Sequence, residues 1–271
     1  MKSVLVTGAT DGIGRETARQ LLAHGWHVFV HGRSKEKAER AVQELGNDPS
    51  CRGSGHAAAV WGDLSRMAEV VDLARQVESR TDALDALINN AGVFEPLRCT
   101  TPDGFEMTMA VNHFAPFVLT RHLLEALRKS PAGRIITVSS IAHGSGTLDL
   151  DDLSFAAHYD GYCAYAASKL ANILFTAALA RRLAGTPVTA NCLHPGVITT
   201  KLLWAGFKMK GRTVEDGART SVHLATSDAV AHTSGKYFVD CVEAQPAVPA
   251  RDETLAEALW TATEGAVARF L

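Results

Sequence analysis

The sequence KSVLVTGATDGIGRETARQLL, residues 2–22, passes from a buried strand through a glycine-rich turn into a helix. Its apolar run Val4–Val6 contains β-branched residues and is typical of a central strand in a parallel sheet. Gly8, Gly12 and Gly14 then allow a tight turn and a close approach of the backbone to a pyrophosphate, at which the following helix directs its free N–H groups. A plain strand-to-helix turn would need only one glycine, so three glycines at this turn favour nucleotide binding.

Strand and helix patterns alternate over the rest of the chain, as a doubly wound α/β sheet requires. We expect about seven parallel strands, near Val4–Thr7, His27–His31, Ala57–Trp61, Ala86–Asn89, Arg134–Ser139, Thr189–Leu193 and Gly235–Val239. Helices on both faces of the sheet are expected near residues 13–24, 35–45, 66–79, 104–129, 162–184, 214–226 and 252–266. The stretch Gly46–Gly55 is predicted to be a surface loop, and residues 1–271 show no repeat or linker, which predicts one Rossmann domain.

Composition and charge are those of an ordinary water-soluble globular protein. Hydrophobic residues make up 46% and charged residues 21% of the 271 positions, and a chain of this length can bury one substantial core. The net charge of −2 provides no basic face for nucleic acid and no polybasic patch for a membrane surface. We therefore expect a small-molecule partner and no nucleic acid.

The cysteines are scattered and odd in number, without the paired spacing of a zinc site. They are Cys51, Cys99, Cys163, Cys192 and Cys241. This pattern is typical of reduced cytoplasmic thiols and predicts no structural metal.

The first residues enter a strand directly, and no apolar run approaches the roughly 20 residues that span a bilayer. We therefore expect a cytoplasmic protein without a signal peptide or a membrane anchor.

Tyr165 and Lys169 are four residues apart in an apolar helical stretch, Tyr162–Phe175. Helical spacing puts both side chains on one face, so the ammonium can lie beside the phenol. A free phenol has a pKa near 10 and is a poor acid or base at neutral pH, whereas a nearby cation lowers that pKa. A Tyr-x-x-x-Lys pair alone occurs by chance on many helices, but beside a nucleotide turn it indicates general acid–base catalysis.

The end of the second strand predicts which nucleotide is bound. An acidic residue there bonds the ribose hydroxyls of NAD, whereas an arginine accommodates the extra phosphate of NADP. Gly32 stands where the acid would be, and the guanidinium of Arg33 follows, with Arg15 able to add charge on the same side. We expect NADP(H) rather than NAD(H); the alternative for Arg33 is a solvated loop charge.

Together these segments resemble the short-chain dehydrogenase/reductase family, in its compact single-domain branch. The motifs occur in the family's order and are Thr7-Gly-Ala-Thr-Asp-Gly-Ile-Gly14, Asn89-Asn-Ala-Gly92, Asn112, Val138-Ser-Ser140, Tyr165-Ala-Ala-Ser-Lys169 and Pro195-Gly-Val-Ile-Thr-Thr200. A closer similarity to the retinol-dehydrogenase-like reductases rests on Asp103-Gly-Phe-Glu-Met107, Val111-Asn-His113 and Ser168-Lys-Leu-Ala-Asn-Ile-Leu-Phe175. Proteins of that subgroup often carry a membrane anchor, so its expected absence makes a retinoid substrate less favoured.

The resemblance implies a nucleotide site built from residues at the ends of several strands. These residues are Gly8, Thr10, Asp11, Gly12, Ile13 and Gly14 in the glycine turn, Arg33, Asp63 and Leu64, Asn90, Ala91 and Gly92, and Pro195, Gly196, Ile198 and Thr200. The pair at 63–64 would contact adenine, and the backbone of 89–92 would line the adenine ribose. Thr200 would bind the nicotinamide carboxamide and so fix which ring face transfers hydride.

The resemblance also assigns the chemical step. Tyr165 would give a proton to the substrate oxygen during reduction and accept it during oxidation. Lys169 would lower the pKa of that phenol and hold the nicotinamide ribose hydroxyls. Ser140, the second serine of the pair, would hydrogen-bond the carbonyl oxygen. Asn112 would anchor a water that links Lys169 to solvent; its alternative is an amide that kinks the helix or bonds the backbone locally.

One departure from the family is the spacing of 25 residues between Ser140 and Tyr165, about twice the usual. The extra segment, His143–Gly161, holds an acidic cluster with a histidine, namely Asp149, Asp151, Asp152 and His158. Its spacing does not fit a metal site, and we expect a loop over the active site, as in the retinol-dehydrogenase-like subgroup. His113 and His143 are interpreted as packing or hydrogen-bonding groups near the cleft.

The segment Leu202–Met209 follows the turn that would bind the carboxamide, where this fold places its lid. Its apolar side chains predict a bulky apolar carbonyl or alcohol as substrate, with Gly206 as a hinge; the alternative is an ordinary helix packed on the body. The helix at 162–184 is apolar around much of its girth, which points to a homodimer or homotetramer through paired helices unless the body of the chain covers it.

Two classes of function remain. The first is an NADP-dependent carbonyl reductase or alcohol dehydrogenase; the second is a catalytically silent NADP-binding regulatory or scaffold protein of the same fold. A silent relative would be free to lose Tyr165, Lys169 or Ser140, and all three are present, which favours the enzyme. An epimerase or dehydratase of the longer branch fits the short C-terminal part and the glycine spacing poorly.

Overall fold

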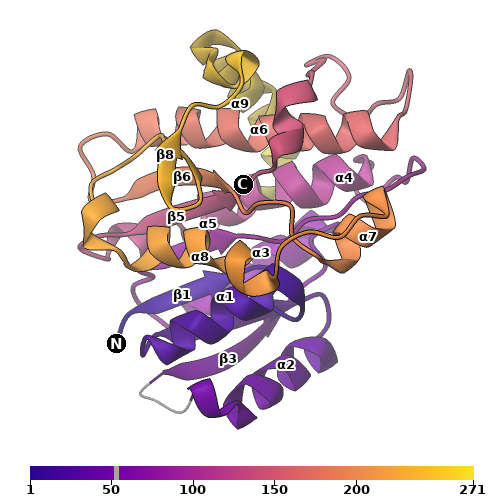
Figure 1. The fold of residues 1–271 in the computed structure, drawn as a ribbon. Helices are drawn as coiled ribbons and strands as arrows, with labels where there is room; N and C mark the ends of the chain where they lie inside the picture. Colours follow the sequence, from indigo (N-terminus) through magenta and orange to yellow (C-terminus); the bar gives the residue numbers. More distant parts are fainter. Residues whose placement is uncertain (52–54) are drawn as a thin grey trace.

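The chain builds one eight-stranded sheet, shown by the computed structural model, which describes residues 1–51 and 55–271 (Figure 1). The strands are β1 Ser3–Val6, β2 His27–Gly32, β3 His56–Trp61, β4 Ala86–Asn89, β5 Arg134–Val138, β6 Thr189–His194, β7 Tyr237–Val239 and β8 Val242–Ala244. Their order is β3-β2-β1-β4-β5-β6-β7-β8, and all neighbours pair in parallel except the last two. The predicted doubly wound parallel sheet is confirmed, with one antiparallel edge strand added.

Helices cover both faces of this sheet. They are α1 Gly12–Ala23, α2 Lys35–Asn47, α3 Met67–Glu78, α4 Met107–Met109, α5 Ala115–Arg128, α6 Gly161–Arg182, α7 Lys201–Phe207, α8 Val214–Thr226 and α9 Glu253–Val267. Short 3₁₀ turns lie at Pro49–Cys51, Ile141–Ser145, Asp228–Val230, Val248–Arg251 and Ala268–Phe270. Alternate residues of β1 divide the core: Val4 and Val6 pack with α1, α2 and α8, and Leu5 packs with α3, α5 and α6.

The sheet order reverses between β1 and β4, because the chain crosses to one side after β1 and to the other side after β3. In open α/β sheets the crevice at such a switch point, outside the carboxyl ends of the strands, is where ligands bind. The glycine turn after β1 and the segment after β4 both open into this crevice. The fold therefore brings the predicted nucleotide residues to one edge of the sheet.

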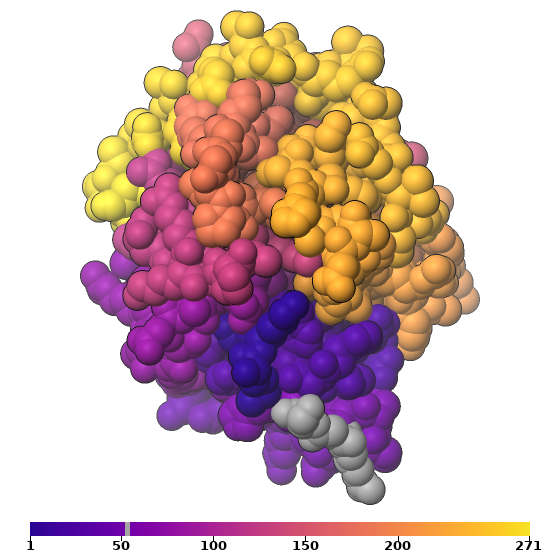
Figure 2. All heavy atoms as spheres, turned by 90° about the vertical axis from the view of Figure 1, so that its left-hand side faces the viewer, coloured from indigo at the N-terminus to yellow at the C-terminus, as the bar shows by residue number. Residues whose placement is uncertain are grey.

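Helix α6 is buried on nearly all sides because α9 packs across it. Figure 2 shows the yellow C-terminal segment spread over the end of the molecule opposite the indigo and purple N-terminal half. Within the described residues, α6 is the one helix long and apolar enough to cross a membrane, but 83% of its most apolar 18-residue window is buried inside the protein. The apolar surface that predicted paired helices is thus covered by the chain's own C-terminal helix.

The helix expected at 104–129 is broken into three pieces: α4, a π-helical turn at Ala110–Phe114, and α5. Glu106 begins α4, since its buried carboxylate accepts from the amides of Thr108 and Met109 at 2.8 and 2.7 Å. Pro116 lies in the first turn of α5, where a missing N–H costs nothing. Asn112 lies inside the π-turn, a feature that recurs at functional sites.

Two further regions differ from the sequence prediction. Strand β8 was not expected, because its exposed residues Val242 and Glu243 lack a buried pattern. Within the predicted loop Gly46–Gly55, the first two residues belong to the last turn of α2, which buries Leu45, and a 3₁₀ turn follows. Residues 52–54 of that loop lie outside the described residues.

Candidate active site

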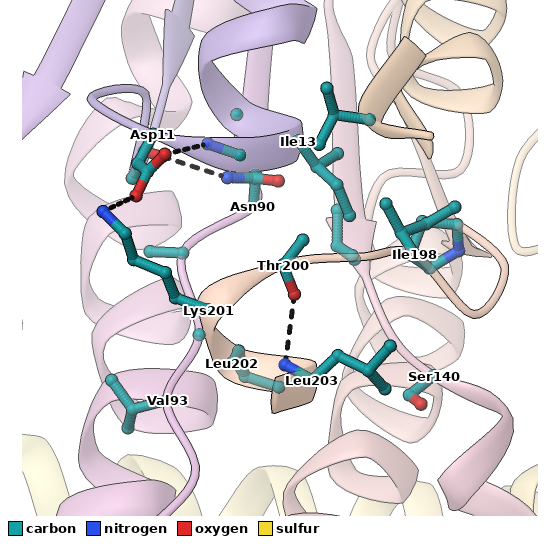
Figure 3. A pocket seen from close by; sticks show the side chains of 18 of the residues that line it. Asp11, Ile13, Asn90, Val93, Ser140, Ile198, Thr200, Lys201, Leu202 and Leu203 are labelled. Carbon is teal, nitrogen blue, oxygen red and sulfur yellow. Dashed lines mark hydrogen bonds and ion pairs between the residues drawn. The ribbon is translucent and has the colours of Figure 1, made fainter. Parts of the chain in front are cut away.

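A cavity of about 1390 Å³ opens along the carboxyl edge of the sheet, between the glycine turn, α6 and α7 (Figure 3). Every residue predicted for the nucleotide or for catalysis lines this cavity except Asn112. The structure thus brings together groups that are up to 192 residues apart in sequence, from Gly8 to Thr200.

The glycine turn is fixed by very close backbone packing. Gly8 has a φ of +64°, which a side chain rarely adopts. A Cβ placed on Gly14 would lie 2.3 Å from the carbonyl oxygen of Gly8 and 2.4 Å from the amide nitrogen of the Asn90 side chain. The first turn of α1 therefore reaches the ends of β1 and β4, and its amides face the cavity.

Thr7 ties the end of β1 to the segment after β4. Its hydroxyl oxygen accepts from the backbone amides of Asn90 and Ala91 at 2.9 and 3.0 Å, and its carbonyl accepts from the Asn90 side chain at 2.8 Å. These bonds hold the segment expected along the adenine ribose. Thr7 was not predicted as a site residue, although a polar residue that closes a buried strand is a usable signal.

His31, buried at the end of β2, was also missed. Its Nδ1 accepts from the amide of Gly8 at 3.0 Å, so its Nε2 carries the proton and donates to the carbonyl of Gly62 at 2.9 Å. Burial lowers the pKa of His31 to about 4, which keeps the ring neutral at physiological pH. The imidazole therefore joins the glycine turn to the end of β3, next to the expected adenine contact.

No carboxylate fits at the end of β2. A Cβ on Gly32 would lie 2.8 Å from a methyl carbon of Thr10 and 3.0 Å from the amide of Ala38. Arg33 follows on the surface, lines the cavity, and has no ion-pair partner in the part of the chain that is described. Arg15 also lines the cavity and pairs with Glu44 at 3.0 Å. The local charge is that of an anion site.

Asp63 and Leu64 lie at the far end of the cavity, after β3. One oxygen of the Asp63 carboxylate accepts from the amide and the hydroxyl of Ser65 at 3.0 and 2.8 Å, and its own amide donates to Glu69 at 2.7 Å. The turn after β3 is therefore held in place from both sides.

Tyr165 and Lys169 face the cavity from α6, with exposed fractions of 7% and 3%. The Lys169 ammonium donates to the carbonyl of Val138 at 3.1 Å, and burial lowers the pKa of Lys169 to about 8. Burial raises the pKa of Tyr165, and a hydrogen bond with Ser140 opposes this shift. In the protein itself desolvation is the larger effect, so the pKa of Tyr165 lies above its ordinary value rather than below it.

The two serines of the pair differ in their environment. Ser139 is buried and its hydroxyl donates to the carbonyl of Lys169 at 2.7 Å, so it braces β5 against α6. Ser140 is half-buried at the cavity, where its hydroxyl oxygen accepts from the amide of Ala142 at 3.2 Å and begins the 3₁₀ turn. The Ser140 hydroxyl lies within hydrogen-bonding reach of Tyr165.

Asn112 lies behind the cavity wall. Its side-chain carbonyl accepts from the amide of Val93 at 2.8 Å, and its NH₂ group donates to the carbonyl of Val93 at 3.0 Å and to the hydroxyl of Ser168 at 2.9 Å. The amide thus bonds the backbone, but at Val93, 19 residues away, rather than locally as the alternative interpretation held. A Cβ on Gly92 would lie 3.4 Å from Lys169 Nζ and 3.5 Å from Asn112 Oδ1, so the two side chains flank the same glycine.

The segment from Thr200 to Met209 forms a lid over the cavity. Thr200 begins α7, its hydroxyl oxygen accepting from the amide of Leu203 at 3.1 Å (Figure 3). Lys201 reaches from the lid to Asp11 in the glycine turn, with Nζ and Oδ2 2.5 Å apart, and this contact is the main reason that the pKa of Asp11 is lowered. At the base of the lid, Thr199 donates to and accepts from the backbone of Arg212 and Gly211.

The inner face of the lid is aromatic. The Phe207 ring lies 5.3 Å from the ring of Phe94 and 6.0 Å from each of Tyr162 and Tyr165, measured between centroids. Phe94 itself lies 5.8 Å from Tyr165. The segment is thus both a helix packed on the body and a wall of the cavity, and its apolar rings surround the catalytic candidate.

The insertion His143–Gly161 does not cover the cavity, contrary to expectation. No residue that lines the cavity comes from it; instead its leucines pack on the core beside α4, and Tyr159 donates to the carbonyl of Glu95 at 2.7 Å. Asp149 and Asp152 accept from amides within the loop, which explains the acidic residues as turn caps. Over the described ranges no group of three or more His, Cys, Asp or Glu residues could hold a metal ion.

Comparison with known proteins assigns this chain to a family. The family model described as short chain dehydrogenase matches residues 2–211, so the chain belongs to the short-chain dehydrogenase family. Together with the fold, this makes it an NAD(P)-dependent oxidoreductase that acts on a carbonyl or an alcohol. Its human relative retinol dehydrogenase 14 is 40% identical over 97% of this chain and 85% of the relative. Within the family, the chain belongs to the retinol-dehydrogenase-like subgroup.

Solved structures similar to this chain have the same fold. An uncharacterized protein from Mycobacterium paratuberculosis superposes with a TM-score of 0.81 at 32% identity, covering 99% of this chain and 94% of that one. Pseudomonas aeruginosa RhlG in complex with NADP gives a TM-score of 0.70 at 27% identity, covering 88% and 93%. Among such similar structures one holds NADP and another NADH, so likeness alone leaves the nucleotide open.

Proposed function

We propose that this protein is an NADP(H)-dependent oxidoreductase that interconverts a carbonyl and an alcohol on an apolar small molecule. The observation that carries the proposal is the placement of Ser140, Tyr165 and Lys169 on one cavity with the glycine turn. All 271 residues would act as one nucleotide-binding domain.

The residues present fit a dinucleotide. The backbone approach at Gly14 leaves no room for a side chain, which makes a cradle that a pyrophosphate needs. Arg33 is exposed beside the cavity, and Gly32 excludes the carboxylate that would select NAD. These two features support NADP over NAD. Asp11 adds negative charge near the expected pyrophosphate, and its pairing with Lys201 offsets that charge.

When bound, the nicotinamide supplies or accepts the hydride. In reduction, Tyr165 gives its hydroxyl proton to the substrate oxygen while the Ser140 O–H hydrogen-bonds that same oxygen and stabilises its developing charge. The buried ammonium of Lys169 favours the phenolate that remains, and the positive charge of an oxidised nicotinamide would act in the same direction. Asn112 would position this lysine through Gly92 and the Val93 backbone.

The substrate class is inferred from the lid. The rings of Phe94 and Phe207 lie edge-on to the Tyr165 ring, and Tyr162 packs on Phe207; this aromatic cluster beside the proton donor suits a bulky aromatic or polyene carbonyl. The name of the human relative makes retinol one member of a test panel.

A screen tests the proposal directly. Loss of NADPH absorbance would be followed with aldehydes and ketones that include 4-nitrobenzaldehyde, and gain of NADPH absorbance would be followed with NADP⁺ and alcohols that include retinol. The same assays with NADH and NAD⁺ test the choice of nucleotide. We expect turnover of an apolar carbonyl with a preference for NADPH. Binding of NADPH without turnover of any panel member would favour the silent binding protein.

We also propose a location and an assembly. The scattered free cysteines support a cytoplasmic protein, and the burial of α6 supports its being a core helix rather than a membrane span. A homodimer or homotetramer remains a prediction; because α9 covers α6, such an assembly would use another surface. Fractionation of cells and light scattering of the purified chain test these two statements.

A further inference from the structure

The peptide unit that joins Ser140 to Ile141 is held at both ends by histidine side chains. Nδ1 of His143 lies 2.6 Å from the carbonyl oxygen of Ser140. Nδ1 of His194 accepts from the amide of Ile141 at 3.2 Å. One imidazole thus holds the carbonyl and another holds the N–H of the same peptide group.

The chemistry of these bonds fixes the proton on each ring. A carbonyl oxygen can only accept, so His143 carries its proton on Nδ1; its Nε2 accepts from the amide of Ala247 at 3.0 Å. His194 accepts at Nδ1 and so carries its proton on Nε2. Both rings must therefore be neutral, in opposite tautomers. Burial lowers the pKa of His194 to about 4, in agreement with a neutral ring.

The two rings come from separate parts of the fold. His143 belongs to the 3₁₀ turn after Ser140, is nearly buried, and packs edge-on against Tyr237 at 5.2 Å. His194 ends β6 and lines the cavity. The contact with Ala247 adds the C-terminal segment after β8. The backbone of Ser140 is thereby anchored to the sheet and to the C-terminal segment.

We propose that His143 and His194 are positioning residues that clamp the Ser140–Ile141 peptide and so aim the Ser140 hydroxyl at the substrate oxygen. The inference rests on the proposed function in assigning that task to Ser140. The backbone of a short loop can shift, and the position of a hydroxyl on that loop shifts with it. A displacement of about 1 Å at a reacting group can lower the rate about a hundredfold. Groups that hold the backbone from behind remove this freedom.

Two variants of His143 separate the clamp from a structural role. In His143→Asn the side-chain NH₂ takes the place of Nδ1 and still donates to Ser140, but the contact with Ala247 is lost. In His143→Gln the amide oxygen takes the place of Nε2 and still accepts from Ala247, but the contact with Ser140 is lost. His158→Gln, on an exposed histidine of the insertion, is the control.

With NADPH and 4-nitrobenzaldehyde, we expect His143→Asn to keep kcat within about threefold of the wild type. His143→Gln should lose at least about tenfold in kcat with an unchanged KM for NADPH. His194→Asn, whose amide oxygen can still accept from Ile141, should exceed His194→Ala in kcat. Equal losses in both His143 variants, or a larger loss in His143→Asn, would overturn the clamp.

The rings themselves provide a second measurement that needs no turnover and no variant. Long-range ¹⁵N–¹H correlation spectra of the wild-type protein report which nitrogen of each histidine is protonated. We expect the Nδ1–H form for His143 and the Nε2–H form for His194; any other pair of tautomers contradicts the proposal. Ser140→Ala serves to test the proposed function apart from the clamp: unchanged turnover in that variant would remove the role of Ser140 while leaving the tautomers as they are.

Discussion

Lys169 Nζ lies 5.5 Å from the centre of the Tyr165 ring, one turn further along α6, and its hydrogen bond goes to the carbonyl of Val138. Among the described residues no carboxylate pairs with this ammonium, and burial lowers the pKa of Lys169 to about 8. We therefore expect the positive charge of Lys169 to affect both the stability of the fold and the activity of the protein.

Removing the phenol should abolish turnover. We expect Tyr165→Phe to lower kcat by about 10² to 10⁴, the range of general acid catalysis, because the substrate oxygen then lacks its proton donor. NADPH binding, measured by fluorescence, should change little, since only one hydroxyl is removed. Tyr159→Phe, whose hydroxyl bonds Glu95 outside the cavity, is the control. Persisting activity in Tyr165→Phe would refute the mechanism.

Removing the buried ammonium should stabilise the fold at neutral pH. A pKa of about 8 in the folded chain against 10.5 corresponds to about 3 kcal/mol of unfavourable burial at pH 7. The unfolded chain binds more protons between pH 8 and 10.5, so wild-type stability rises across this window as the cost is relieved. Asn172 also donates to Val138, at 3.3 Å, so that carbonyl keeps a partner in Lys169→Met.

We therefore expect Lys169→Met to raise the free energy of unfolding at pH 7 by up to about 3 kcal/mol, and this gain to shrink toward pH 10.5. Urea unfolding at pH 7, 9 and 10 without nucleotide measures it. Lys37→Met, on the exposed face of α2, should show no such pH dependence. A gain that stays constant with pH would mean that burial does not perturb Lys169.

Arg33 should decide the preference for the nucleotide. We expect Arg33→Ala to raise the KM for NADPH by about 10- to 100-fold, the loss of a charge-assisted hydrogen bond, and to leave the KM for NADH nearly unchanged. The comparison variant Arg40→Ala removes another exposed arginine of the same region, paired with Glu44 and outside the cavity. An equal rise in the KM for NADPH and for NADH would mean that Arg33 does not bind the extra phosphate of NADP.

The glycine turn should not tolerate a methyl group at Gly14. Because its Cβ would lie 2.3 Å from the carbonyl oxygen of Gly8, Gly14→Ala must displace the turn, at a cost of about 1–3 kcal/mol in stability and with loss of NADPH binding. Gly46→Ala in α2 is the matched control, since no atom lies within 4 Å of its Cβ. Thermal unfolding and nucleotide titration compare the two. Normal nucleotide binding by Gly14→Ala would contradict the expected role of this close approach.

The lid should select apolar substrates through Phe207. We expect Phe207→Ala to raise the KM for 4-nitrobenzaldehyde about tenfold while the KM for NADPH stays within a factor of about two, because its ring contacts Phe94 and Tyr165 rather than the glycine turn. Lys210→Ala, beyond α7 and outside the cavity, should behave as wild type. An equal change in the KM for both substrates would mean that Phe207 closes the lid rather than contacts the carbonyl compound.

Patterns within short stretches predicted most elements to within one or two residues. The strands at Val4, Ala86 and Arg134 were visible as short apolar runs that are buried at every residue, and the helix at Val214–Thr226 was visible because its buried residues repeat with the helical period. The break at Asn112 was not visible, because the same apolar pattern continues through α5. The insertion at His143–Gly161 was misplaced, since its leucines pack on a surface that lies far away in sequence.

From its sequence alone, this protein is a doubly wound nucleotide-binding chain with a tyrosine–lysine pair, because glycine spacing, strand patterning and helical periodicity are local properties. Only the tertiary structure shows that desolvation controls the charges of Tyr165 and Lys169, that α9 covers α6, and that two histidines meet at the Ser140 peptide. A side chain's burial and its hydrogen-bond partners depend on residues that are distant along the chain. Only the packing of the folded chain brings those residues close together in space.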